Sequence, residues 1–196
     1  MRYMAIAVIV SLFGLNSCSS TNGISGQNSV TNAPKEAVTT DNFRQTLNYV
    51  NSIRAKGATC GPSVAPINWN NNLANAASAH VNDMAINGFV KHAGSGGSYD
   101  IAGSKEGIQS SFIDRIKYFG FPFVTGNLVG ENIARVSIKN TKTNQLMPNF
   151  KRAVENWLND PPHCEILMNK RFTDIGMAYY KKGEYYYFVM VLGEKK

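Results

Sequence analysis

Apolar side chains recur every three or four residues in four stretches of the chain, the spacing that lines one face of a helix. Phe43, Leu47 and Val50 show it in the first stretch. Glycines follow the first three stretches and two prolines follow the fourth, and both residue types end helices. We therefore expect four helices, from Asp41 or Asn42 to Lys56, from the end of Asn-Trp-Asn-Asn-Asn (68–72) to Asn87, from Ile108 to Phe119, and from about Asn149 to Asp160.

Three further stretches are rich in branched apolar and aromatic residues and predict strands: 128–138, 174–180 and 185–193. The last two flank Lys-Lys-Gly-Glu, a short glycine-containing connection that favours a hairpin. Helices and strands do not alternate along the chain as they do in a parallel doubly wound sheet. The pattern predicts one α+β domain over residues 41–196, with a small, mainly antiparallel sheet covered by helices.

The N-terminus has a different pattern. One basic residue precedes an apolar run from Met4 to Leu15, which is too short to span a bilayer and is typical of a secretory signal. The ending Leu-Asn-Ser-Cys at 15–18 resembles the bacterial lipobox, which implies that residues 1–17 are removed and that Cys18 carries a lipid. The alternative is an ordinary signal peptide with an incidental cysteine.

The next segment, 18–40, has no aromatic residue and little apolar content, so it predicts a flexible tether. We expect an exported protein, anchored to the bacterial cell envelope through its N-terminal lipid. Ser19 resembles the sorting signal for the outer membrane if the organism is Gram-negative.

The composition, 43% apolar and 17% charged, is that of a globular domain, and the formal net charge is +7. No run of basic residues is longer than two, whereas a surface that follows nucleic-acid phosphates needs clustered charge. The charge favours general attraction to anionic surfaces and no dedicated nucleic-acid partner.

Once Cys18 is assigned to the lipid, Cys60 and Cys164 remain. In an oxidising compartment such a pair favours a disulfide over two free thiols or metal ligands. The bridge would close a loop of about 100 residues and contribute roughly 4–5 kcal/mol by restricting the unfolded chain. It would also hold His163, the neighbour of Cys164.

The three histidines are His80, His92 and His163. His92 lies beside the glycine-rich stretch 94–98, typical of a flexible loop, so its ring should be accessible. Glu131 is an acid inside an apparent strand, which is unusual unless it is paired. His92, His163 and Glu131 could bind a divalent metal such as zinc or hold a water molecule. The alternative is that they are unrelated polar residues. His80 lies on the apolar face of its helix, where a buried, hydrogen-bonded ring is the usual case.

Four motifs occur in order: "INWNNNLANAASAHVNDMA", "FVKHAG", "GENIA" and "AVENWLNDPPHCEILMNKRFTDIGMAYY". Together they resemble the CAP superfamily, or SCP domain, of cysteine-rich secretory, antigen 5 and pathogenesis-related proteins, in its short bacterial branch. The resemblance covers about residues 41–193. It implies a three-layer α-β-α sandwich with a central cleft that bears two histidines and two acids.

In that resemblance His92, Glu131 and His163 match three of the four cleft residues. The fourth is an acid three positions after the helix tryptophan, where this chain has the shorter Asp160, which could instead end the helix before Pro161. Glu155 and Glu165 are nearby alternatives. His80 would support the cleft from behind.

The resemblance implies a ligand-binding protein for a lipid or other small apolar molecule, or a surface interaction protein, with no required cofactor. The alternative is a metal- or water-dependent hydrolase of peptidase type, with His92, Glu131 and His163 as its catalytic candidates. The sequence has neither a His-Glu-x-x-His motif nor a Gly-x-Ser-x-Gly motif, which weakens the hydrolase alternative.

Overall fold

The computed structural model describes residues 8–10, 40–122, 124 and 126–195. The helices are α1 (Thr40–Lys56), α2 (Asn71–Asn87), α3 (Phe112–Tyr118), α4 (Ile138–Thr141), α5 (Leu146–Leu158) and α6 (Pro161–Leu167). The strands are β1 (Val8–Val10), β2 (Asn68–Trp69), β3 (Val129–Ser137), β4 (Asp174–Lys182) and β5 (Tyr185–Gly193).

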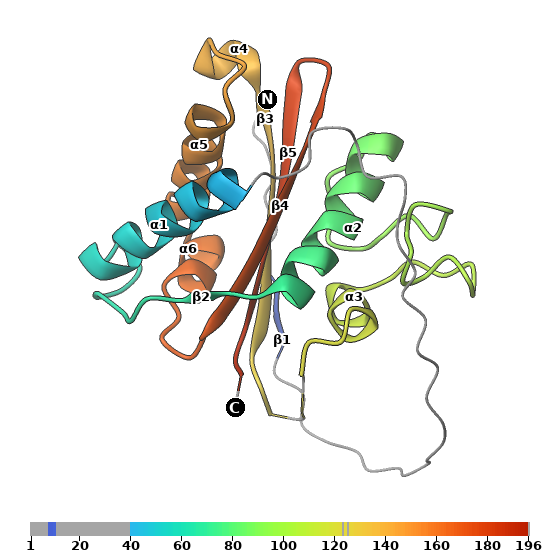
Figure 1. Ribbon diagram of the computed structural model, residues 1–196, viewed down its shortest axis with the longest axis horizontal. Helices are drawn as coiled ribbons and strands as arrows, with labels where there is room; N and C mark the ends of the chain where they lie inside the picture. The colour runs from blue at the N-terminus through green and yellow to red at the C-terminus, as the bar shows by residue number, and fades with distance from the viewer. Residues whose placement is uncertain (1–7, 11–39, 123, 125, 196) are drawn as a thin grey trace.

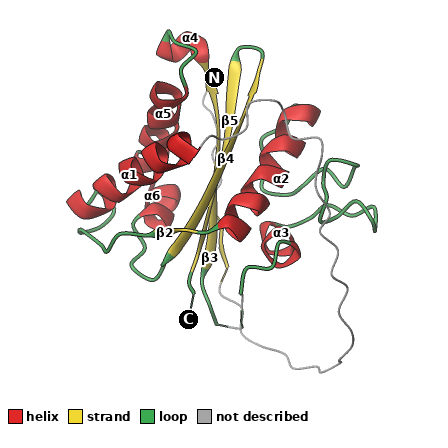
Figure 2. Ribbon diagram, in the orientation of Figure 1, coloured by secondary structure: helices red, strands yellow, loops and turns green. Residues whose placement is uncertain are grey.

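The strands form one sheet in the order β1-β3-β5-β4-β2, antiparallel except where β2 runs parallel to β4. The predicted hairpin is confirmed: β4 and β5 pair from Lys182↔Tyr185 to Asp174↔Gly193. Helices α1, α5 and α6 cover one face of the sheet and α2 and α3 the other (Figures 1 and 2). This confirms the three-layer α-β-α sandwich.

Each helical layer has its own apolar core against the sheet, because side chains alternate between the two faces of a strand. Leu128, which directly precedes β3, and Val136 belong to the core under α1, α5 and α6, whereas Val129 and Ile133 belong to the core under α2 and α3. Glu131 therefore points into the α2–α3 layer and Asn132 into the opposite layer. This alternation decides which residues can meet.

Helices α3 and α5 begin at other residues than predicted. Helix α3 begins at Phe112, because Ser111 and Asp114 form a capping box there, and Ile108 stays outside it with 52% of its surface exposed. Helix α5 begins three residues early, with Pro148 in its first turn, where a missing amide proton is tolerated.

The two prolines after α5 also behave differently from the prediction. Helix α5 ends at Leu158, and Pro161 and Pro162 occupy the first two positions of a second helix, α6, with Asp160 at its N-cap position. Proline is favoured at the first helical position because its fixed φ suits a helix. His163 is therefore held in the first turn of a helix.

Strand β1 lies within the predicted signal segment and pairs antiparallel with Val129–Glu131 of β3. Cys18 and nearly all of the predicted tether lie outside the described residues. In the described part of the chain, no helix has the length and apolarity needed to cross a membrane.

The predicted Cys60–Cys164 disulfide is present and joins the segment after α1 to α6, with 6.0 Å between the two Cα atoms. Arg54 of α1 reinforces this connection. Its buried guanidinium donates to the carbonyl of Leu167 at the end of α6 (2.7 Å) and to that of Ala65 (3.0 Å). Burial lowers the pKa of Arg54.

Candidate functional site

His92 and Glu131 meet as predicted. Helix α2 ends at Gly88, whose left-handed conformation (φ 76°) turns the chain back across the end of the sheet. His92 Nδ1 then lies 2.8 Å from Glu131 Oε1. Glu131 is fully buried and only 11% of the His92 side chain is exposed, so the ring is much less accessible than the glycine-rich sequence predicted.

Arg115 of α3 completes this cluster. Its Nη2 lies 3.1 and 3.0 Å from the two oxygens of Glu131 and also donates to the His92 carbonyl at 2.8 Å. The sequence analysis missed this residue. A signal was available, because Arg115 follows Phe112 by three residues and so lies on the apolar face of α3, where a cation needs a buried partner.

The charges in this cluster are balanced. Burial acts to raise the pKa of Glu131, but Arg115, His80 and the hydrogen bond from His92 outweigh it and bring that pKa to about 2. Burial also lowers the pKa of His80 to about 4. His80 is therefore neutral at pH 7, and Arg115 is the cation that balances Glu131.

The imidazole rings of His80 and His92 each have one nitrogen without a hydrogen-bond partner in the described structure. His80 Nε2 lies 2.8 Å from the Lys91 carbonyl, so it must carry the proton. The Glu131 carboxylate likewise fixes the proton of His92 on Nδ1. In the described part of the molecule, His80 Nδ1 and His92 Nε2 are buried without a hydrogen-bond partner.

The glycine-rich connection is held in place, contrary to the flexible loop expected at 94–98. Asp83 accepts hydrogen bonds from the amide (2.8 Å) and hydroxyl (2.6 Å) of Ser95. Asp100 accepts from the amides of Gly96 and Ser110, both at 2.9 Å. Ser110 in turn accepts from Arg115 Nη1 at 3.0 Å, so the connection is joined to the charged cluster.

His163 and Asp160 form a second pair. His163 Nδ1 is hydrogen-bonded to the Asp160 carboxylate, and Asn132 Nδ2 donates to the His163 carbonyl at 3.1 Å. Asp160 thus stands at the N-cap position of α6 and contacts the histidine, whereas the helix end considered for it falls at Leu158, with Asn159 as the C-cap. The alternatives do not take its place: Glu155 pairs with Arg152 at 3.3 Å, and Glu165 is exposed.

The four predicted site residues therefore meet as two pairs. The His92–Glu131 pair lies on the α2–α3 side of β3, and the His163–Asp160 pair lies on the opposite side, where Asn132 bonds to the His163 carbonyl. In each pair the imidazole Nδ1 is occupied by a carboxylate, so neither Nδ1 is open to a metal. No group of three or more His, Cys, Asp or Glu side chains that could hold a metal ion occurs among the described residues.

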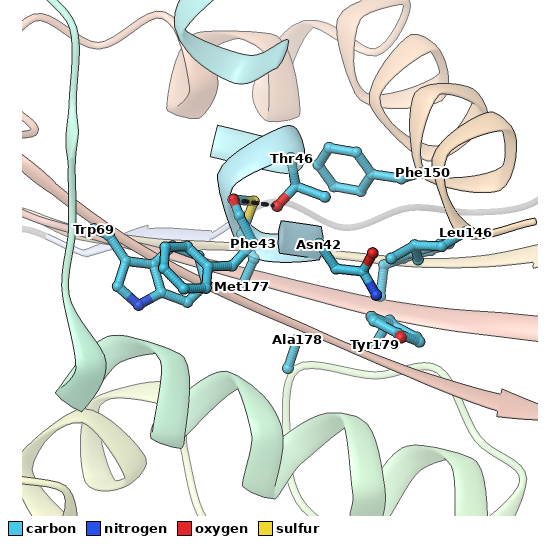
Figure 3. Close-up of a pocket in the computed structure, with 10 residues that line it drawn as sticks. Asn42, Phe43, Thr46, Trp69, Leu146, Phe150, Met177, Ala178 and Tyr179 are labelled. Carbon is cyan, nitrogen blue, oxygen red and sulfur yellow. Dashed lines mark hydrogen bonds between the residues drawn. The ribbon is translucent and has the colours of Figure 1, made fainter. Parts of the chain in front are cut away.

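A separate apolar pocket lies in the α1–α5 layer (Figure 3). Its empty volume is about 280 Å³, part of it open to solvent. Phe43 and Trp69 stack on one side, with 4.8 Å between ring centroids. The lining residues come from α1, β2, α5, β4 and β5, and they are Asn42, Phe43, Thr46, Trp69, Leu146, Phe150, Met177, Ala178, Tyr179 and Phe188.

The sequence analysis did not find this pocket. Phe43, Tyr179 and Phe188 carry the periodicity of core residues, and periodicity cannot tell a filled core from an unfilled one. Trp69 was the available signal, because a large aromatic ring in an asparagine-rich stretch has few apolar neighbours along the chain.

Among solved structures, an extracellular protein containing a SCP domain from Bacillus anthracis is 23% identical, with a TM-score of 0.55. The match covers 78% of this chain and 40% of that one, so this chain spans well under half of the Bacillus protein. An outer surface protein from Borrelia burgdorferi is 19% identical, with a TM-score of 0.56, and the match covers 81% of this chain and 96% of that one. At these identities the likeness shows the fold.

The search of curated proteins found no match. The model of the cysteine-rich secretory protein family, CAP, matches residues 47–192, which include α2, the His92–Glu131 pair, α6 and the hairpin. The chain therefore belongs to the cysteine-rich secretory protein (CAP) family.

Proposed function

We propose that this protein is a lipoprotein of the cell envelope whose CAP domain binds a small apolar molecule in the aromatic pocket. The pocket itself is the observation that carries the proposal. Thr46 donates its hydroxyl proton to the Phe43 carbonyl (2.9 Å), so the walls offer mainly apolar surface. Apolar burial contributes about 25 cal/mol per Å², and aromatic walls supply much area with little loss of side-chain freedom.

The size of the pocket limits the ligand. The 280 Å³ includes open solvent, and the cavity proper is about 20 Å³, far below the roughly 300–1,000 Å³ of drug-sized sites. We infer a ligand as small as the end of one acyl chain. The comparisons give no support to the hydrolase alternative, and the carboxylate of Glu131 is engaged by Arg115 and His92.

Tryptophan fluorescence tests the proposal, because the chain has only two tryptophans, Trp69 in the pocket and Trp157, which is fully buried. Titration of the purified lipoprotein with a brominated fatty acid should quench Trp69 saturably, since bromine acts at short range. The Trp157→Phe variant should keep the quenching and Trp69→Phe should lose it.

A filled-pocket variant provides the second arm. Leu146→Phe should abolish saturable quenching, whereas Leu158→Phe, on the same helix but outside the pocket lining, should leave it unchanged. Absence of saturable quenching in the wild type, or equal quenching in the Leu146→Phe variant, would remove the apolar ligand from this pocket.

The lipid anchor has its own test. Changing Cys18 to Ala removes the thiol that would carry the lipid, so the variant should not carry a lipid anchor on its N-terminal residue. Mass spectrometry of the N-terminal peptide from wild type and variant measures this. An unmodified Cys18 in the wild type would contradict the anchor while leaving the pocket unaffected.

A further inference from the structure

Among the described residues, a strand pairs with the outer edge of β3 over only a third of its length. Its inner edge pairs with β5 from Val129 to Ser137. On the outer edge, the described structure has β1, whose three residues pair as Val8↔Glu131, Ile9↔Gly130 and Val10↔Val129. Figure 1 shows β1 beside the end of β3 where that strand begins.

The covering strand belongs to the predicted signal segment. Removal of residues 1–17 would take β1 away and leave the backbone of Val129–Glu131 with an open edge. Unpaired amide and carbonyl groups on an edge strand are a template for another extended chain. The open edge depends on the removal of residues 1–17, which is part of the proposed function. It does not depend on the apolar pocket, whose lining includes no residue of β3.

The surroundings favour an apolar strand. Val129 and Glu131 are fully buried on the α2–α3 side. On the other side α6 lies close, since a Cβ on Gly130 would meet Ile166 and Phe172 at 3.1 and 3.2 Å. A chain added here lies between two helical layers, where β-branched apolar residues such as Val-Ile-Val fit and charged ones do not.

We propose that in the mature protein the outer edge of β3 at Val129–Glu131 accepts an extended apolar peptide segment from another polypeptide. The segment adds as an antiparallel strand in the register that Val8–Val10 shows. Backbone hydrogen bonds supply the affinity, and the closeness of α6 and the α2–α3 layer selects apolar side chains.

Hydrogen exchange on the mature lipoprotein tests this. The amides of Val129 and Glu131 face the outer edge, because the neighbouring Leu128 carbonyl faces β5 and amides alternate along a strand, so these two should exchange rapidly in the free protein. A peptide of residues 4–12 with lysines added for solubility, at about nine times its dissociation constant, should slow that exchange about tenfold, because protection grows as one plus ligand over Kd. The same peptide with Val10→Pro should give no protection, because residue 10 lies opposite Val129 in the hydrogen-bonded register and proline has no amide proton to donate there.

Each other outcome overturns the proposal. Slow exchange of the Val129 and Glu131 amides without peptide shows an edge that is already covered, and an intact mass that includes residues 1–17 shows that β1 is retained. Equal protection by the proline peptide or by a fatty acid shows apolar capture without strand addition. The Leu146→Phe variant shows whether peptide binding depends on the apolar pocket. It fills the pocket and should leave the protection by the peptide unchanged.

Discussion

At the scale of single residues, the buried ion pair between Arg115 and Glu131 controls the state of His92. The guanidinium keeps Glu131 ionised inside the domain, and the ionised carboxylate holds the His92 proton on Nδ1. Arg115 also donates to the His92 carbonyl, so one side chain positions both the ring and its backbone. Loss of Arg115 should leave an unbalanced buried charge.

Arg115→Met should therefore lower the free energy of unfolding by about 3–5 kcal/mol, the usual effect of breaking a buried pair. Combining it with Glu131→Gln should recover part of the loss, because the uncompensated charge is removed. Arg152→Met, which breaks an exposed pair with Glu155, is the control and should cost under about 1 kcal/mol. Urea unfolding of the wild type, Arg115→Met, Glu131→Gln, their combination and the control measures this, and additive losses for Arg115 and Glu131 would contradict the coupling.

Acid should destabilise the domain in two steps. The folded-state pKa of His80 is about 4 and its unfolded value is 6.5, so the unfolded chain binds more protons between these pH values and stability falls as pH drops through them. Glu131, at about 2 against 4.5, acts likewise at lower pH. Each step is worth roughly 3 kcal/mol at most.

His80→Gln keeps a donor for the Lys91 carbonyl and should flatten the decline between pH 6.5 and 4. Glu131→Gln should flatten only the lower step. Unfolding free energies measured by urea from pH 7 to 3 decide this, and an unchanged slope in His80→Gln would place the acid sensitivity at another group.

The candidate site was predictable residue by residue only where a polar side chain broke an apolar pattern. Glu131 in a strand and His80 on an apolar helix face gave such signals. The pairing of His163 with Asp160 was not derivable, because it depends on a helix that starts at two prolines usually taken as an end. To predict on which face of the sheet each site residue lies, the register of β3 must be known as well.

At the scale of elements, α2 lies unusually close to the hairpin. A Cβ on Gly176 of β4 would overlap the backbone of Leu73 and Ala74 at the start of α2. Asn70 caps that start through the amides of Asn72 and Leu73 and bonds to Asp174 at 3.0 Å. Helix and strand are thus fixed to one another at this end.

Gly176→Ala should consequently lower the melting temperature sharply, with a cost of about 3 kcal/mol or more, because backbone cannot yield to a side chain as another side chain can. Gly61→Ala is the matched control, since its added Cβ would lie 3.7 Å from the Met168 Cβ, an ordinary contact. Similar melting temperatures for the two variants would mean that α2 can shift on the sheet at little cost.

Element type followed from periodicity for α1, α2, β3, β4 and β5, because each is long and uses a single period. The short elements were missed for physical reasons. Two-residue β2 exists only because it pairs with β4, and four-residue α4 is too short for a periodic pattern.

At the scale of the whole molecule, two links join the α1 end of the domain to α6. One is the Cys60–Cys164 bridge, with a sequence separation of 104. The other is Arg54, whose guanidinium donates to the carbonyl of Ala65, shortly after Cys60, and to that of Leu167, shortly after Cys164. Arg54 can hold the geometry without the bridge, so the bridge chiefly restricts the unfolded chain.

Replacing both Cys60 and Cys164 with Ala should therefore lower the free energy of unfolding by up to about 4–5 kcal/mol while leaving the fold intact. Urea unfolding with and without reductant measures the loss, and reductant should affect only the wild type. Two free thiols in wild-type protein purified without reductant would contradict the bridge.

The sheet order also sets the order in which the domain can fold as the chain grows from its N-terminus. Strands β4 and β5 are the last elements of the chain, yet β5 is the central strand and α2 packs on both. Helices α1 and α2 precede these strands by more than 80 residues, so the sheet surface on which α2 packs is incomplete until the hairpin has been made. The domain can close only when residues 174–193 are available.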